Sequence, residues 1–161
     1  MAAGTTACGE NLLVKGSHDI QTAADTTLER LVAENRLESA AWDAVVVPGG
    51  LPGADNLAAS AETGAFLSAM AAAGKLVCAI CAAPARVLAP LGILTGKKFT
   101  CYPGEEANVT GAEWKQDRVV VDGALITSRG AGTAGEFACA ITALLVNKAE
   151  AEKLAERLLL S

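Results

Sequence analysis

Residues 76–91 read LVCAICAAPARVLAPL, and this stretch decides the fold. The apolar run 76–80 predicts a buried strand, and the Ala-rich residues 82–91 predict a helix that follows it without a loop. A strand that passes directly into a helix forces the residue between them into a strained turn at the end of the sheet. Cys81 occupies this junction. Its neighbours are small alanines, and the first helical turn accepts Pro84.

The position of Cys81 predicts a reactive thiol. Backbone N–H groups at a helix N-terminus and the helix dipole both favour a thiolate, which is the nucleophilic form of cysteine. The alternative is that Cys81 is a small buried hydrophobic residue, which is the usual fate of an unpaired cysteine. Of these two alternatives, we predict that Cys81 is a nucleophile. The other cysteines each fall within a predicted strand or helix, where we expect structural thiols: Cys8, Cys78, Cys101 and Cys139.

Two glycines end the strand that precedes this unit. The strand is predicted at 42–47, and Gly49 and Gly50 follow it after a proline. In a parallel sheet the carboxyl ends of neighbouring strands meet at one edge, so these glycines should face Cys81. Their N–H groups, with that of Ala82, would then form an oxyanion or carboxylate site. The alternative is a plain turn.

The remaining chain alternates apolar runs with Ala-rich helical stretches, which predicts a single α/β domain over residues 1–161 with a mainly parallel sheet. Thr26 with Glu29, and Thr133 with Glu136, have the spacing of capping boxes that begin helices. We expect strands at 4–8, 12–15, 19–23, 42–47, 76–80, 99–101, 119–121 and 125–128, and helices at 26–38, 61–73, 82–91, 133–146 and 149–160. Asp122-Gly123 predicts a hairpin turn between the last two strands.

Composition excludes several classes of partner. The net charge is −5 and no Lys/Arg cluster occurs, which argues against nucleic acid and anionic membranes. No apolar run reaches the roughly 18 to 20 residues of a membrane span, and the first residues do not resemble a signal peptide. The five cysteines are an odd number, which favours reduced thiols in the cytoplasm. With one histidine and one C-x-x-C, a metal site is not expected.

Three blocks carry a resemblance to a known family: VVVPGGLPGADNL (45–57), AICAAP (79–84) and LITSRGAGTAGEFA (125–138). Together they resemble the ThiJ/PfpI superfamily, and specifically its Parkinson-disease-protein subgroup. The resemblance covers nearly the whole chain. It implies a flavodoxin-like three-layer sandwich, usually dimeric, with Cys81 as the nucleophile.

The same resemblance implies the activity. Members act without a cofactor on small aldehydes, converting methylglyoxal to lactate as glyoxalase III enzymes, or on glycated adducts as deglycases. Others are redox sensors or chaperones in which the cysteine is oxidised, and this is the alternative function. Distant relatives are peptidases, which the subgroup makes the weaker expectation.

Two positions depart from the family pattern. Tyr102 stands where many members carry a histidine after the strand that follows the cysteine. A phenol does not replace imidazole as a base at neutral pH, so Tyr102 can at most donate a hydrogen bond. His18, the only histidine, falls where relatives often carry an arginine near the dimer interface. A solvated turn residue is an equal alternative for His18.

A larger departure concerns the first βα unit. Family members begin with a strand and a helix whose connecting turn supplies a Glu to the cysteine, and this unit is absent from the chain. No segment of that type occurs among the 161 residues. We therefore expect either a homodimer or a complementing N-terminal segment from another chain, because an interrupted sheet exposes unpaired backbone groups.

Overall fold

The computed structural model describes residues 4–8, 11–16 and 18–160. Its centre is a four-stranded sheet in the order β5-β6-β10-β9, formed by Ala44–Val47, Leu76–Ile80, Leu125–Ser128 and Val119–Asp122. β6 pairs in parallel with β5 and β10, while β9 is antiparallel to β10. The sheet is therefore mainly parallel, and the hairpin predicted around Gly123 is confirmed.

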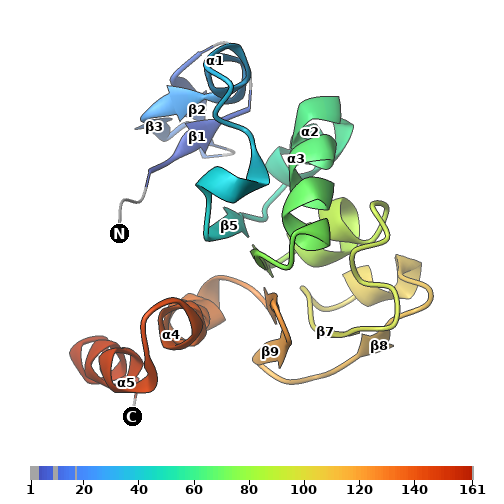
Figure 1. The fold of residues 1–161 in the computed structure, drawn as a ribbon. Helices are drawn as coiled ribbons and strands as arrows, with labels where there is room; N and C mark the ends of the chain where they lie inside the picture. Colours follow the sequence, from blue (N-terminus) through green and yellow to red (C-terminus); the bar gives the residue numbers. More distant parts are fainter. Residues whose placement is uncertain (1–3, 9–10, 17, 161) are drawn as a thin grey trace.

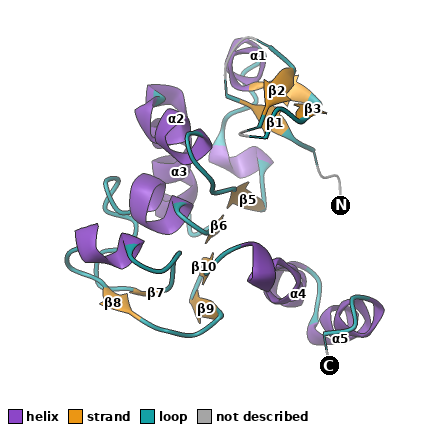
Figure 2. Ribbon diagram, turned by 180° about the vertical axis from the view of Figure 1, so that it is seen from behind, coloured by secondary structure: helices purple, strands orange, loops and turns teal. Residues whose placement is uncertain are grey.

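Helices cover both faces of this sheet (Figure 2). On one face lie α2 and α3, on the other lies α4, and α5 packs on the outside of α4. Their bounds are Gly53–Ala59, Ala61–Ala72, Ala134–Leu145 and Lys148–Arg157. This arrangement is the predicted three-layer α/β sandwich, and it has a flavodoxin-like fold.

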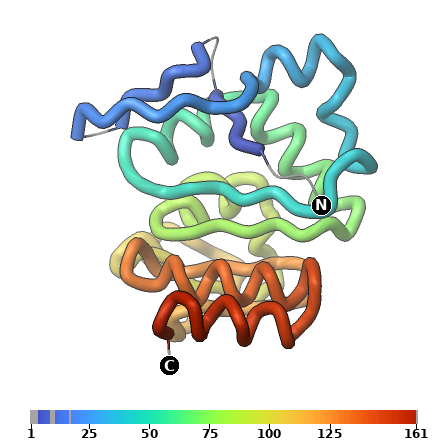
Figure 3. Tube along the Cα trace, turned by 90° about the vertical axis from the view of Figure 1, so that its left-hand side faces the viewer, coloured from blue at the N-terminus to red at the C-terminus, as the bar shows by residue number. Residues whose placement is uncertain are grey.

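The N-terminal part of the chain forms two small strand pairs. β1 and β4 are parallel, β2 and β3 form an antiparallel hairpin, and α1 follows them. Figures 1 and 3 show this part at the opposite end of the molecule from α4 and α5. The bounds are Thr6–Ala7, Thr26–Thr27, Leu13–Lys15, Gln21–Ala23 and Leu28–Ala33.

Short elements complete the structure. β7 and β8 form a parallel pair, and a wide helical segment, η2, follows β6. Three 3₁₀ turns, η1, η3 and η4, lie in the connections. These elements span Lys98–Phe99, Glu113–Trp114, Pro84–Leu88, Ser39–Ala41, Glu105–Asn108 and Ala131–Thr133.

Alternation along β6 divides the core into two layers. Val77 and Ala79 belong to the cluster that includes Leu67 of α3, whereas Cys78 belongs to a second cluster with Phe137 of α4. Successive strand side chains point to opposite faces of a sheet, so β6 contributes to both clusters. β6 is consequently buried from both sides, which positions the residue that follows it with little freedom.

Both expected capping boxes are wrong. The N-cap of α1 is Thr27, one residue later than expected, and its hydroxyl accepts a hydrogen bond from Arg30 N at 3.2 Å. Thr133 Oγ1 does not cap α4; it exchanges hydrogen bonds with the backbone of Gly130. Glu136 accepts a hydrogen bond from Arg118, whereas the N–H of Thr133 donates to the carbonyl of Gly130. Long-range partners thus replace the local pattern.

The helix expected at 82–91 is also different in kind. Residues 84–88 form a π-helix, in which the N–H of Ala89 donates to the carbonyl of Pro84 at 3.0 Å. Pro84 is at the first position of this helix, where an N–H would have no acceptor within the helix, so proline is accepted there as expected. π-helical turns inside helices occur often at functional sites.

Two further differences concern the edge strand β5 and its neighbour. Residues 53–59 form α2, which we did not predict. The apolar run 42–47 is typical of a buried strand, but β5 is half exposed at Val46, which is 51% exposed. Since α4 packs on β10, β9 and β6, it leaves this part of β5 uncovered. Across residues 4–8, 11–16 and 18–160, no helix combines the length and apolar character that a membrane crossing requires.

Candidate active site

Cys81 lies at the end of β6 in a strained backbone conformation. Its φ angle is 65°, in the left-handed region that a non-glycine residue rarely adopts. Its N–H donates to the carbonyl of Ser128 at 2.9 Å, and its carbonyl accepts from the N–H of Tyr102 at 2.8 Å. Neighbouring segments therefore hold both polar backbone groups of Cys81, which explains how the strain persists. The predicted strand-to-helix elbow is confirmed.

Gly49 packs directly against this elbow. A Cβ atom added to Gly49 would lie 2.6 Å from the Cβ of Cys81 and 2.5 Å from the carbonyl oxygen of Ile80. Real side chains do not approach so closely, so only glycine fits at this position. The predicted contact between the turn at 48–50 and Cys81 is thus present in the structure. The turn packs against the cysteine and does not only connect two elements.

The backbone amides beside Cys81 are open. Among the described residues, none accepts a hydrogen bond from the N–H of Gly49, Gly50 or Ala82. Gly50 has φ 85° and leaves open space around its α carbon. Donors of this kind, held by the surrounding backbone, are suited to stabilising an oxyanion or a carboxylate. They remain the candidate oxyanion donors.

Tyr102 contacts Cys81 through its backbone N–H. The residue is 53% exposed, and its ring lies against Gly130, where an added Cβ would be 3.5 Å from Cδ2. His18 lies in the exposed turn between β2 and β3. The structure therefore brings Tyr102 to Cys81 through the backbone, whereas His18 belongs to a separate pair of strands.

The other cysteines differ from Cys81 and from one another. Burial raises the pKa of the Cys78 thiol to about 12. Burial, together with the carboxylates of nearby Glu106 and Glu105, also raises the pKa of Cys101 to about 12. These two are structural thiols, as predicted. Cys8 and Cys139 depart from the prediction of buried positions, because Cys8 is exposed and Cys139 is half-buried.

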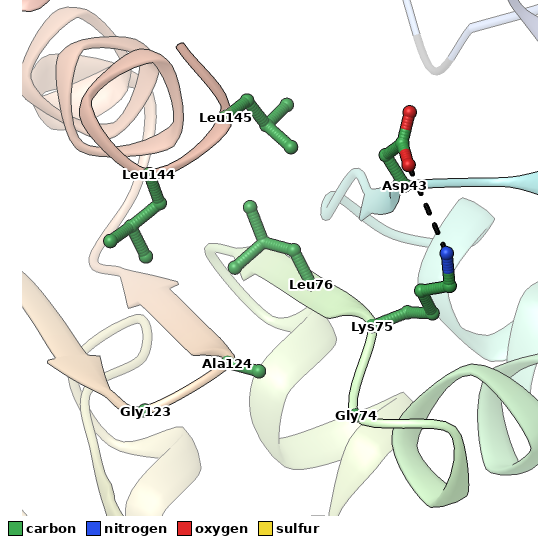
Figure 4. A pocket seen from close by; sticks show the side chains of 8 residues that line it. All are labelled: Asp43, Gly74, Lys75, Leu76, Gly123, Ala124, Leu144 and Leu145. Carbon is green, nitrogen blue, oxygen red and sulfur yellow. Dashed lines mark ion pairs between the residues drawn. The ribbon is translucent and has the colours of Figure 1, made fainter. Parts of the chain in front are cut away.

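A cavity of about 570 Å³ lies at the other end of the strands (Figure 4). Asp43 and Lys75 form an ion pair at its rim, with 3.8 Å between Oδ1 and Nζ. The cavity is lined by Asp43, Gly74, Lys75, Leu76, Gly123, Ala124, Leu144 and Leu145. It opens at the amino ends of β6 and β10, whereas Cys81 follows the carboxyl end of β6, so it takes no part in the candidate site.

Sequence reasoning missed the backbone partners of Cys81. Ser128 of β10 pairs with Ile80 of β6 in parallel register. Because Cys81 follows Ile80, the carbonyl of Ser128 then accepts the N–H of Cys81. Knowledge of this register would have identified Ser128, but hydrophobic periodicity alone does not give it. The tyrosine amide has no signal in the sequence, since it acts through the main chain.

Comparisons with known proteins agree with this geometry. The family model described as the DJ-1/PfpI family matches residues 2–144. Protein dj-1beta of Drosophila melanogaster is 40% identical over 150 residues, which cover 92% of this chain and 76% of that protein. Protein DJ-1 homolog B of Arabidopsis thaliana is 42% identical over 135 residues, but the chain spans only 30% of its length.

A relative named as an enzyme and two solved structures are also similar to this chain. A glutathione-independent glyoxalase of Caenorhabditis elegans is 34% identical over 132 residues, covering 81% of this chain and 69% of that protein. A DJ-1 superfamily protein from Salmonella typhimurium, crystallised as a mutant, superposes with a TM-score of 0.87 at 38% identity, covering 96% of this chain and 81% of that one. Oxidized DJ-1 of Toxoplasma gondii superposes with a TM-score of 0.87 at 34% identity, and the match covers 96% of this chain and 80% of that one.

Proposed function

The chain belongs to the DJ-1/PfpI family, and on this basis we propose that it acts on reactive aldehydes such as methylglyoxal, or on glycated adducts, through Cys81 and without a cofactor. The observation that carries the proposal is the left-handed backbone of Cys81 at the end of β6. This turn presents the thiol beside amides that have no other acceptor in the described chain. The similarity to a glutathione-independent glyoxalase supports the substrate class.

The chemistry follows from the residues at the elbow. The Cys81 thiolate adds to the aldehyde carbon of methylglyoxal, and the electron pair of the carbonyl moves onto its oxygen. The open amides of Gly49, Gly50 and Ala82 are the donors that we assign to this oxyanion. The oxyanion re-forms a carbonyl as hydrogen moves with its electron pair from this carbon to the neighbouring ketone carbon. The ketone oxygen takes a proton from water, and a second water cleaves the resulting thioester. Lactate and the free thiol result, so neither an oxidant nor a reductant is consumed.

Lactate formation tests the proposal directly. Purified protein is incubated with methylglyoxal in the absence of glutathione, and lactate is followed by proton NMR. We expect lactate from the wild type and none from Cys81→Ser, because an unactivated hydroxyl lacks the nucleophilicity of a thiolate. The absence of lactate from the wild type, or equal lactate from the variant, would refute the assignment.

A second candidate function is redox sensing by Cys81. It is favoured by Tyr102, which offers no imidazole at the position beside the elbow, while oxidation of a thiolate needs no such base. The similarity to an oxidized DJ-1 structure is consistent with this chemistry. Peroxide treatment followed by peptide mass spectrometry separates the two functions. A sensor takes up oxygen selectively at Cys81 and shows no aldehyde turnover.

We further propose that the protein works with a second polypeptide, either a second copy or a segment that completes the sheet. Within the described residues, β5 pairs with β6 alone, and Val46 is 51% exposed. The β2–β3 region also exposes large apolar side chains: Leu12, Leu13, Val14 and Ile20. Unpaired strand edges and apolar patches of this kind are typical of association surfaces. Light scattering after size-exclusion chromatography gives the test, and a cooperatively folding monomer at micromolar concentration would contradict the proposal.

A further inference from the structure

Arg86 connects three segments of the chain through one guanidinium group. It lies in η2, the π-helix that follows Cys81. Its Nε and Nη2 donate to the two carboxylate oxygens of Glu105 at 2.7 and 3.1 Å, and its Nη1 donates to Asp55 Oδ1 at 3.1 Å. Glu105 begins η3 and Asp55 lies in the first turn of α2. A single side chain therefore joins η2, η3 and α2.

Asp55, the carboxylate of α2 that Arg86 binds, is connected to the turn that contains Gly49 and Gly50. α2 begins directly after that turn, and the N–H of Ala54 donates to the carbonyl of Gly50 at 2.8 Å. Asp55 is the next residue in this helical turn. Any displacement of Asp55 would therefore be passed to Gly50, whose amide is one of the candidate oxyanion donors.

Glu105, the second carboxylate that Arg86 binds, is connected to Cys81 through the Tyr102 loop. The N–H of Glu105 donates to the carbonyl of Tyr102 at 3.1 Å, and the N–H of Tyr102 donates to the carbonyl of Cys81 at 2.8 Å. Two consecutive hydrogen bonds thus lead from Glu105 to the reactive residue. Arg86 consequently holds both loops that flank Cys81 against the helix that the same cysteine begins.

The geometry of this cluster suits a rigid link. The Glu105 side chain is only 16% exposed, and Arg86 holds the pKa of its carboxyl below the ordinary value through two hydrogen bonds. Bidentate pairing fixes orientation as well as distance, and a lysine cannot reproduce the fork. By contrast, Arg30 pairs with Glu34 at 3.2 Å within α1 and its cap, so that pair joins no separate segments.

We propose that Arg86 is a positioning residue for the Cys81 site: it sets the distance between the glycine turn and the Tyr102 loop. The part of this inference that concerns turnover rests on the proposed function. Displacements of about 1 Å in an active site can lower the rate about a hundredfold. Loss of the link therefore affects the chemistry even when the fold survives.

Amide hydrogen exchange tests the link without any substrate. In Arg86→Met we expect the amides of Ala54, Tyr102 and Glu105 to exchange about tenfold faster, because the loops that they anchor open more often. Arg30→Met, the matched control, should leave these three amides unchanged. Glu105→Gln breaks the same link from the other side and replaces Arg86→Met if the latter does not fold. Unchanged exchange at all three amides would overturn the proposal.

Turnover of methylglyoxal tests the consequence. We expect Arg86→Met to lower kcat at least about tenfold with a smaller change in KM, and Arg86→Lys to fall between the variant and the wild type. Faster exchange with unchanged kcat and KM would show a purely structural link and would overturn the positioning role. If the wild type itself makes no lactate, the proposed function fails, and the rate of Cys81 alkylation by iodoacetamide replaces turnover. Equal alkylation rates in the wild type and Arg86→Met would then reject the positioning role.

Discussion

The two ends of the central strands differ in how tightly their atoms are placed. At the carboxyl ends, Gly49 leaves no room for a Cβ against Cys81, and the polar backbone groups of that cysteine are both paired. At the amino ends, the chain surrounds an open cavity of about 570 Å³ whose rim carries an ion pair at 3.8 Å. A second cavity of about 510 Å³ lies beside Arg86 and Glu105, so the two regions differ in how closely the backbone is packed rather than in cavity volume.

This difference favours the carboxyl ends of the strands as the place of the proposed chemistry. In the proposed function the thiol of Cys81 acts beside open amides at fixed positions, and such donors lie at the carboxyl ends of the parallel strands. The amino ends offer space and one weak ion pair. The comparison predicts that substitutions at the carboxyl ends change function strongly, while similar substitutions at the amino ends do not.

The largest expected effect concerns thiol reactivity. At pH 7.5 iodoacetamide should alkylate Cys81 on the order of a thousandfold faster than Cys78 and Cys101, because thiols with a pKa of about 12 are almost fully protonated at that pH. Cys81 should also react faster than half-buried Cys139. Peptide mass spectrometry of the folded protein measures each rate. Equal labelling of Cys81 and Cys139 would contradict the prediction that the strand-to-helix turn makes Cys81 more reactive.

The second effect concerns the contact between Gly49 and the elbow. Gly49→Ala adds a methyl group 2.6 Å from the Cβ of Cys81, so we expect kcat/KM to fall at least about tenfold and the melting temperature to fall by several degrees. Gly53→Ala is the matched control, because a Cβ at Gly53 meets nothing within 4 Å. Calorimetry and lactate assays measure both variants, and similar values for the two would contradict the packing argument.

A smaller effect, on stability, is expected from Glu105→Gln. Arg86 lowers the pKa of Glu105 from its ordinary 4.5 in the folded protein, so the stabilisation is present above that value and disappears as the pH falls through the lower folded pKa. The variant should therefore melt about 2 °C below the wild type at pH 7, with the difference shrinking at pH 3. Thermal unfolding at both pH values measures this. A difference independent of pH would exclude the ionic interaction as its cause.

The smallest effect is expected at the amino ends. Asp43→Asn removes the ion pair with Lys75, but Asp43 is 76% exposed and the pair is long, so solvent screens it. Lactate formation should change less than about twofold, and the melting temperature by less than about 1 °C. A loss of turnover comparable to that of Gly49→Ala would contradict the prediction that substitutions at the amino ends affect function less than substitutions at the carboxyl ends.

Features that depend on neighbouring residues were predictable from the sequence. The strand at 76–80 and the hairpin around Gly123 have the predicted positions, because apolar alternation and turn residues determine them locally. The elbow at Cys81 was predictable for the same reason: a strand-like run and a helix-like run meet there without a loop. The turn at Gly49 and Gly50 followed from the parallel sheet.

Features that depend on distant residues were not predictable. Thr133 has the spacing of an N-cap to Glu136, yet it bonds to Gly130 and the glutamate bonds to Arg118. Both alternatives satisfy the same polar groups, and only the tertiary structure selects between them. Arg86 likewise shows no pattern in sequence that connects it to Asp55 and Glu105, since three separate segments must fold before they meet.

The hydrogen bond from Cys81 to Ser128 also bears on the order of events during synthesis. Ser128 lies in β10, which leaves the ribosome well after β6. A nascent chain that ends before β10 already contains the cysteine but lacks the carbonyl that holds its amide. Strained backbone persists only where surrounding structure holds it. The strained turn at Cys81 therefore forms only after β10 has been made.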